Sequence, residues 1–274
     1  MASYGDDEQH GSAPARDDPN VTVISERLPK IRLRCSPRAA HYNQTRSRQR
    51  QWPEDMARKQ FDLIVFDWDG TLMDSTSTIV KCIQAAARDL GLPAPKDADA
   101  AHVIGLGLQE AMQAAMPGID PKYYPRMVER YRYHYLAKDH ELILFAGVRE
   151  MLQDLSQQAY FLAVATGKSR VGLNRALNAV KLLSLFDATR CADETFSKPH
   201  PAMLQELTRE LGQDMKRTVM VGDTSHDLLM ANNAGAAGVA VQYGAHPVEQ
   251  LDACAPLYSA ATVAQLHQWL NENA

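Results

Sequence analysis

Two aspartates that directly follow an apolar run are the residues of this chain best placed to do chemistry. The run spans residues 61–66 and leads into the pentapeptide DWDGT, which places Asp67 and Asp69 one residue apart. In open α/β sheets, ligands bind beyond the carboxyl ends of the strands. Two carboxylates at that position are able to hold a divalent cation, attack an electrophile and transfer a proton. Asp, Gly and Thr are also common turn residues, so other parts of the chain must decide between a catalytic site and a turn.

Further polar groups follow two later apolar runs. Residues 160–165 lead into Thr166-Gly167, where a hydroxyl and backbone N–H groups before a helix suit a phosphate oxygen. Residues 218–221 lead into the hexapeptide GDTSHD, which adds two more carboxylates. The carboxyl ends of parallel strands meet at one edge of a sheet, so we expect these groups to lie beside the first two aspartates.

A lysine lies between these two segments. Lys198 comes just before a helix that is expected to begin at Pro201. An anionic substrate among four aspartates needs positive charge, and one lysine together with one cation would supply it. Taken alone, such a lysine is typical of a solvated surface. The position of Lys198 in the chain, after the Thr166 segment and before the GDTSHD segment, favours a functional role.

The elements that must position these groups alternate between strands and helices, which predicts a parallel sheet with helices on both faces. An exception is the segment 75–145, which contains only helical patterns and is expected to form a separate unit. The expected strands are 61–66, 160–165, 188–191, 218–221 and 238–241. The expected helices are 79–90, 106–116, 123–137, 147–157, 169–179, 201–211, 225–234 and one that begins near 261.

Taken together, these segments resemble the haloacid dehalogenase superfamily, in the capped subgroup that includes phosphoglycolate phosphatases. The resemblance rests on four motifs in order: DWDGT at 67–71, Thr166, Lys198 and GDTSHD at 222–227. It implies an α/β fold, with a Rossmann-like parallel sheet that has helices on both faces and a small all-helical cap inserted after the first strand. The implied core domain comprises residues 59–74 and 146–274, and the implied cap comprises residues 75–145.

The resemblance also implies a role for each motif residue. Asp67 would be the nucleophile that forms an aspartyl-phosphate, and Asp69 would act as the general acid and base. Thr166 would donate a hydrogen bond to the phosphoryl oxygens, and Lys198 would stabilise the negative charge on Asp67 and the phosphate. This assignment fits phosphoryl transfer, which depends mainly on an in-line nucleophile and on neutralised oxygens.

The resemblance further implies a Mg²⁺ cofactor. The ligands of the ion would be the side chain of Asp67, the backbone carbonyl of Asp69 and the side chain of Asp223. Asp227 would bind the ion or orient the waters on it.

The cap is expected to select the substrate. The resemblance implies that the loop containing Gly105 and Gly107 reaches the active site and contacts the substrate together with Gly167, although it also reads as an ordinary turn before a helix. The resemblance also implies that the second carboxylate, Asp69, argues against dehalogenation and against cleavage of a carbon–phosphorus bond. The prediction is therefore a Mg²⁺-dependent phosphatase that acts on a small phosphomonoester resembling phosphoglycolate. The alternatives are a phosphomutase of the β-phosphoglucomutase type and a non-catalytic binding protein.

Composition limits the partners and the compartment. The chain of 274 residues is 45% hydrophobic and 23% charged, which is ordinary for a globular protein. The apolar runs are shorter than the ~18 residues of a membrane span. Four cysteines without C-x-x-C spacing argue against a zinc site or a disulfide framework and fit a reducing cytosol. We expect a cytoplasmic monomer or homodimer that acts on a small phosphorylated metabolite and does not bind a membrane.

Charge is distributed unevenly along the chain. Residues 1–60 carry 11 Lys and Arg against 8 Asp and Glu, whereas residues 61–274 carry 18 against 25. The negative charge of residues 61–274 argues against binding of nucleic acid to the folded part of the chain. A stripe of tyrosines and arginines at 123–135 has helical spacing and puts Met127, Tyr131 and Tyr135 on one face, which favours core packing over a nucleic-acid surface.

Residues 1–58 show no regular periodicity and are expected to be a disordered tail or an upstream extension. We therefore expect deletion of residues 1–55 to leave phosphatase activity within about twofold of the full chain, because no motif lies there. Phosphate release by the two proteins, compared at equal concentration, tests this. A large loss would show that the N-terminal segment belongs to the working enzyme.

Overall fold

The computed structural model of the chain describes residues 60–158 and 160–274. The expectation for residues 1–58 concerns a segment outside this described part. Among the described residues, no helix has the length and apolar character needed to cross a membrane.

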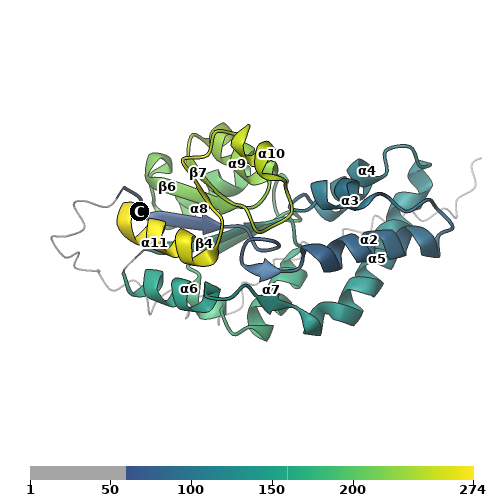
Figure 1. The fold of residues 1–274 in the computed structure, drawn as a ribbon, viewed down its shortest axis with the longest axis horizontal. Helices are drawn as coiled ribbons and strands as arrows, with labels where there is room; N and C mark the ends of the chain where they lie inside the picture. The colour runs from purple at the N-terminus through teal and green to yellow at the C-terminus, as the bar shows by residue number, and fades with distance from the viewer. Residues whose placement is uncertain (1–59, 159) are drawn as a thin grey trace, which may run out of the picture. The chain divides into compact units, whose positions relative to one another are not determined.

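A six-stranded parallel sheet forms the centre of the described chain, in the strand order β5-β4-β1-β6-β7-β8 (Figure 1). Its first strand, β1, lies between β4 and β6, so the chain extends first to one side of β1 and then to the other. Such a reversal opens a crevice at the carboxyl end of the sheet. The strands are β1 (Leu63–Phe66), β4 (Phe161–Thr166), β5 (Ala188–Cys191), β6 (Thr218–Gly222), β7 (Ala237–Val241) and β8 (Tyr258–Ala260).

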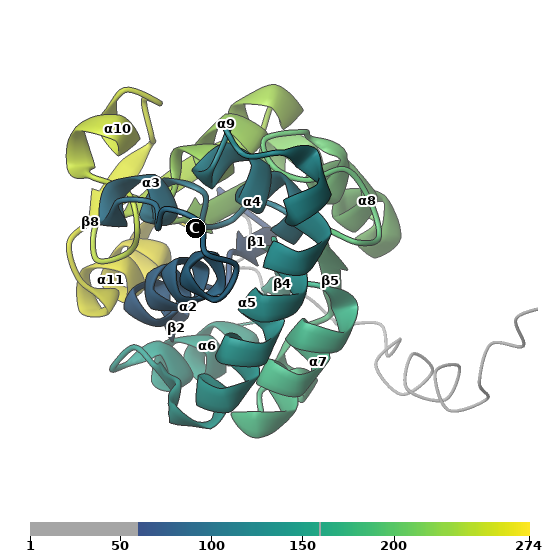
Figure 2. The same ribbon diagram turned by 90° about the vertical axis from the view of Figure 1, so that its right-hand side faces the viewer.

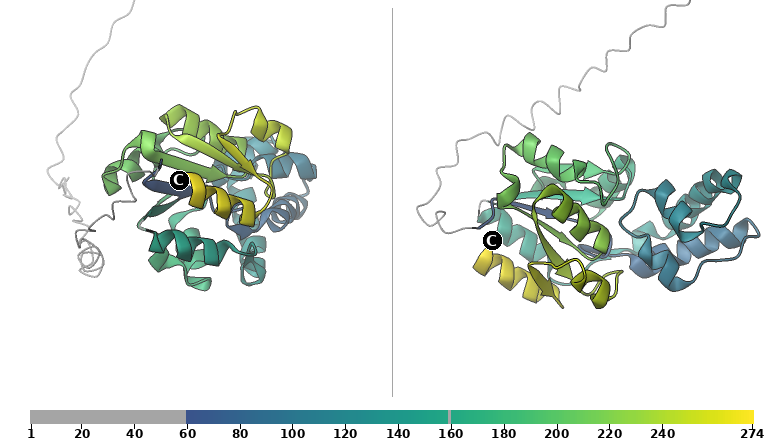
Figure 3. Two further views of the ribbon diagram at one scale, coloured as in Figure 1. Left: turned by 60° about the vertical axis from the view of Figure 1, so that its left-hand side comes forward. Right: turned by 90° about the horizontal axis from the view of Figure 1, so that it is seen from above.

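Helices cover both faces of this sheet, as Figure 3 shows from two sides. Successive side chains of a strand point to opposite faces, and in β1 both sets are apolar and buried. Ile64 and Phe66 pack in a cluster with residues of α6, α7 and α11, whereas Leu63 and Val65 pack with residues of α8 and α9. The covering helices are α6 (Val148–Gln157), α7 (Arg170–Ala179), α8 (Ala202–Leu211), α9 (Ser225–Ala234), α10 (Val248–Asp252) and α11 (Val263–Asn273).

The register of the sheet brings the motif segments to one edge. Phe66, the last residue of β1, pairs with Val164 of β4 and with Val221 of β6. The residues that follow each strand therefore emerge side by side. These are the DWDGT loop, the Thr166-Gly167 segment and the segment that begins at Gly222.

A separate group of helices lies beyond this edge of the sheet and faces the viewer in Figure 2. These helices share an apolar cluster of their own, which includes Ile83, Met112 and Met127. They are α2 (Thr76–Asp89), α3 (Asp97–His102), α4 (Leu108–Ala115) and α5 (Tyr124–Lys138). We refer to α2–α5 and their connecting loops as the cap. A short antiparallel pair, β2 (Met73–Asp74) with β3 (Ile143–Leu144), joins the chain entering the cap to the chain leaving it.

The structure confirms the predicted fold class and adds elements that the sequence pattern did not indicate. The unpredicted elements are α3, β2, β3, β8 and α10, all of six residues or fewer. Short elements carry too few apolar residues to establish a period. On α5, Met127 and Tyr135 are buried, in agreement with the predicted packing face.

Truncation of a central strand residue should destabilise the core strongly. We expect Ile64→Ala to lower the free energy of unfolding by about 2–5 kcal/mol, because the fully buried side chain would leave a cavity. Urea denaturation of the two proteins measures the difference. Leu257→Ala is the matched control: its side chain is 52% exposed, so the expected change is within about 0.5 kcal/mol. Equal effects of the two substitutions would contradict the described core.

Candidate active site

The DWDGT loop turns sharply after β1 and directs its first carboxylate into the protein. Asp67 is fully buried, and its backbone N–H donates to the carbonyl of Val221, 2.9 Å away. Gly70 has a φ of +82°, which glycine adopts at little cost. A Cβ on Gly70 would also lie 2.1 Å from Oδ2 of Asp223. Glycine at this position therefore allows both the turn and the close approach of the Asp223 carboxylate.

One ammonium group lies between two of the buried carboxylates. Lys198 Nζ is 2.7 Å from Oδ1 of Asp67 and 2.6 Å from Oδ1 of Asp227. The side chains of Asp67, Asp223 and Asp227 have oxygens within 4.8 Å of one another. The structure thus brings together four residues from three separate segments of the sequence. Three of them are acidic and one is basic.

Short side chains and backbone N–H groups fix the two carboxylates that follow β6. Asp223 accepts hydrogen bonds from the Thr71 hydroxyl at 2.7 Å and from the Ala245 backbone N–H at 2.8 Å. Asp227 accepts from the backbone and the hydroxyl of Thr224 as part of the capping box that begins α9. Both oxygens of Asp227 are therefore engaged, one by Thr224 and the other by Lys198. This arrangement suits Asp227 to orienting the lysine.

Burial and the excess of acidic groups shift the pKa values of the site residues. Burial raises the pKa of Asp67 to about 7, against the lowering effect of Lys198. Burial also holds the pKa of Asp223 well above its usual range, and the charges of Asp67 and Asp227 act in the same direction. Burial by itself would lower the pKa of Lys198, but its ion pairs with the two aspartates raise it. The site is therefore short of positive charge.

A divalent cation fits this arrangement. Oδ2 of Asp67 is buried and has no hydrogen-bond partner among the described residues. Asp223 accepts one hydrogen bond on each oxygen, which leaves each oxygen with acceptor capacity. Carboxylate oxygens are the ligands that Mg²⁺ prefers. The chemistry of the donors thus agrees with the predicted metal site.

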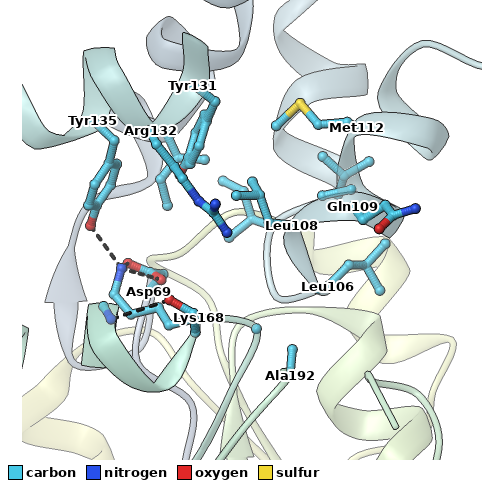
Figure 4. A pocket seen from close by; sticks show the side chains of 18 of the residues that line it. Asp69, Leu106, Leu108, Gln109, Met112, Tyr131, Arg132, Tyr135, Lys168 and Ala192 are labelled. Atoms are coloured by element: carbon cyan, nitrogen blue, oxygen red, sulfur yellow. Dashed lines mark hydrogen bonds and ion pairs between the residues drawn. The ribbon is translucent and has the colours of Figure 1, made fainter. Parts of the chain in front are cut away.

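Asp69 lies apart from this acidic cluster and faces the cap. Its carboxylate accepts a hydrogen bond from Ser75 at 2.7 Å and forms an ion pair with Lys168, with Nζ 3.0 Å from Oδ2. The same Nζ donates to the hydroxyl of Tyr135 on α5, 2.8 Å away (Figure 4). Burial would lower the pKa of Lys168, but the neighbouring Asp69 raises it. A lysine of the core therefore connects the predicted acid and base to a tyrosine of the cap.

The cap loop between α3 and α4 touches the core beside Thr166. Thr166 is buried, and its hydroxyl accepts from the backbone N–H of Lys168. A Cβ on Gly167 would lie 2.3 Å from the carbonyl oxygen of Leu106 and 2.6 Å from that of Gly105. The backbone N–H of Gly107 donates to the Ser197 hydroxyl at 2.7 Å. The predicted glycines thus mark a close contact between the cap and the core.

A second contact between the cap and the core involves histidines. The Nε2 atoms of His226 and His246 lie 2.8 Å and 3.0 Å from the backbone carbonyl oxygen of His102, at the end of α3. The backbone N–H of Ser225 donates to Nδ1 of His246. Burial lowers the pKa of His246 to about 4. A neutral His246 that donates from Nε2 to the His102 carbonyl and accepts on Nδ1 from Ser225 satisfies both of its own contacts.

The structure places the predicted residues around one edge and adds several that the sequence reasoning missed. Thr71, Ser75, Tyr135, Lys168 and Thr224 all contact a site carboxylate or its partner. Lys168 is adjacent to a predicted residue, so its position in the sequence was a usable signal. Tyr135 is 31 residues from Thr166 and more than 60 residues from every other core motif, and only the packing of α5 reveals its contact with Lys168.

Comparison with known proteins places the chain in one hydrolase family. Residues 64–241 match the family model of haloacid dehalogenase-like hydrolases. The chain is 39% identical over 202 residues to the probable phosphatase IndB of Dickeya dadantii. The match covers 71% of this chain and 86% of that protein. It is 34% identical over 204 residues to a phosphoglycolate phosphatase of Caulobacter vibrioides, with coverage of 72% and 86%.

A solved structure supports the same family. The crystal structure of a predicted phosphoglycolate phosphatase from Haemophilus somnus 129pt has a TM-score of 0.68 and 27% identity, and the match covers 77% of this chain and 98% of that one. The chain therefore belongs to the haloacid dehalogenase-like hydrolase family. The predictions of this family and of an enzyme of the phosphatase class are confirmed.

The contact at Gly167 generates a direct test. We expect Gly167→Ala to lower kcat/KM for phosphate release by about tenfold or more, because the added methyl group would push the cap loop away from the site. Steady-state kinetics on the full chain measure this. Gly118→Ala is the matched control, since a Cβ there would meet open space and should leave kcat/KM unchanged. Normal activity of Gly167→Ala would show that the close approach of the loop is dispensable.

Proposed function

We propose that the protein is a Mg²⁺-dependent phosphatase that hydrolyses a small phosphomonoester through an aspartyl-phosphate on Asp67. The observation that carries the proposal is the buried Asp67 carboxylate, which has one oxygen paired with Lys198 and the other without a partner among the described residues. The oxygen without a partner is left for the metal, and the oxygen beside Lys198 keeps lone pairs with which to attack phosphorus, while Lys198 supplies the cation that a buried carboxylate needs. Phosphoglycolate is the first compound to test, since relatives carry that substrate in their names.

In the proposed first step, an oxygen of Asp67 bonds to phosphorus while the ester bond between phosphorus and the leaving oxygen breaks. Asp69, which must be protonated for this step, gives its proton to that oxygen, and an alcohol departs. In the second step, Asp69 takes a proton from water, whose oxygen bonds to phosphorus while the bond to Asp67 breaks. The products are inorganic phosphate and the original two carboxyl groups.

Other groups of the site would stabilise the transferring phosphoryl group. Lys198 would neutralise charge on Asp67 and the phosphate, and the Thr166 hydroxyl would donate to a phosphoryl oxygen. Mg²⁺ would be held by the side chains of Asp67 and Asp223 and by the backbone carbonyl of Asp69, with Asp227 beside it. When bound, the ion would supply positive charge to the phosphoryl oxygens.

The nucleophile assignment has a sharp test. We expect Asp67→Asn to lower phosphate release by about a thousandfold or more, because an amide does not form the phosphoryl intermediate. Asp252→Asn, an exposed acidic residue on α10, is the matched control and should retain full activity. Circular dichroism of each variant checks the fold. Unaltered turnover in Asp67→Asn would overturn the mechanism.

The metal assignment is tested on the unmodified chain. We expect EDTA to abolish phosphate release and added Mg²⁺ to restore it. Release that persists in EDTA would contradict the metal site. A requirement for a bisphosphate activator, with transfer between positions of a sugar instead of release, would identify the phosphomutase alternative.

A further inference from the structure

A cavity of about 680 Å³ opens from the catalytic edge into the cap. Its core side includes Asp69, Lys168 and Ala192, and its cap side comes from α4, α5 and the loop before α4 (Figure 4). A volume of this size is in the range of sites that hold ligands of drug size. A two-carbon acid would leave most of it unfilled.

The cap side of this cavity is largely aliphatic. Half-buried Leu106 and Leu108 face the core residues across it in Figure 4, and Met112 lies above them in that view. Both leucines also pack against the apolar cluster of the cap, to which Met112 belongs, so this lining is the edge of the cap core that borders the cavity. The further aliphatic side chains that line the cavity include Ile79, Ile83, Val103 and Ile104.

The charged groups around the cavity do not offset this character. Lys168 is paired with Asp69, and Arg175 is paired with Asp139. Arg132 reaches toward the cavity from α5, but its residue is largely exposed to solvent, and the carboxylate of Glu110 also lines the cavity. A carboxylate inside the aliphatic part would lose hydration without a buried partner.

We infer that the cap selects phosphomonoesters whose leaving group is an extended apolar chain or ring, seated between Leu106, Leu108 and Met112. The inference rests on the proposed function, because it takes Asp67 and Asp69 as the site of phosphoryl transfer. Asp69 lines the same cavity, so the oxygen that it protonates would carry its organic group directly into the apolar part. Each methylene buried there adds favourable transfer free energy.

A series of primary n-alkyl phosphates from ethyl to hexyl tests the inference, because all members have similar leaving-group chemistry. We expect kcat/KM with Mg²⁺ to rise by up to about fourfold per methylene. Hexyl phosphate should exceed both ethyl phosphate and phosphoglycolate by about tenfold or more. A flat or falling series would overturn the inference. A tenfold preference for phosphoglycolate over ethyl phosphate, lost in Arg132→Gln, would also overturn it and indicate ionic recognition.

A variant locates the preference in the cap. We expect Leu108→Gln to reduce the ratio of kcat/KM for hexyl over ethyl phosphate by about fivefold or more, since a polar group would enter the apolar part. Leu257→Gln makes the same change on an exposed leucine outside the cavity and should leave the ratio unchanged. An unchanged ratio in Leu108→Gln would overturn the assignment.

The same experiment separates this inference from the proposed function. Acetyl phosphate is a small activated phosphoryl donor that does not depend on the apolar cavity. Its hydrolysis without a rise along the alkyl series would refute only the inference. Absence of Mg²⁺-dependent release from every compound, acetyl phosphate included, would refute the phosphatase proposal itself.

Discussion

The structure depends on one electrostatic constraint, the burial of three carboxylates around a single ammonium group. Asp67, Asp223 and Asp227 are fully buried, and Lys198 pairs with two of them. Removing a charge from water is costly unless it is paired and hydrogen-bonded. The parallel sheet meets this requirement because it delivers side chains and backbone N–H groups from several strand ends to one place. Thr71, Thr224 and the N–H of Ala245 then hold the carboxylates in position.

The same constraint explains why small residues surround the site. Side chains on Gly70, Gly222 and Gly244 would each lie within 2.5 Å of a site carboxylate. The backbone therefore packs directly against the charged groups. Beside them, Gly167 of the core approaches the loop containing Gly105 on the cap. In the proposed mechanism, the reacting groups are thus carried by strand ends, and a cap loop lies next to them.

The proposed function assigns phosphate chemistry and substrate choice to different parts of the chain. In that proposal, the charged groups for phosphoryl transfer come from the core, and the aliphatic side chains beyond Asp69 come from the cap. Lys168 and Tyr135 connect the two, since the ammonium that pairs with Asp69 also donates to the cap tyrosine. This division agrees with the different names that similar proteins bear, among them a phosphoglycolate phosphatase and a pyrophosphatase.

The sequence by itself determined the fold class, the four motifs and their order, because strand-to-loop transitions and residue spacing are local signals. The prediction that Asp67, Asp69, Thr166, Lys198 and Asp223 lie near one edge of the sheet was made in this way. Only the tertiary structure decided which partners these residues have. The ion pair of Asp227 with Lys198, the link from Lys168 to Tyr135 and the aliphatic cavity all join separate segments of the chain. A distance in space between such segments has no signature in a single sequence, because it depends on how helices pack and where the cap loop lies on the core.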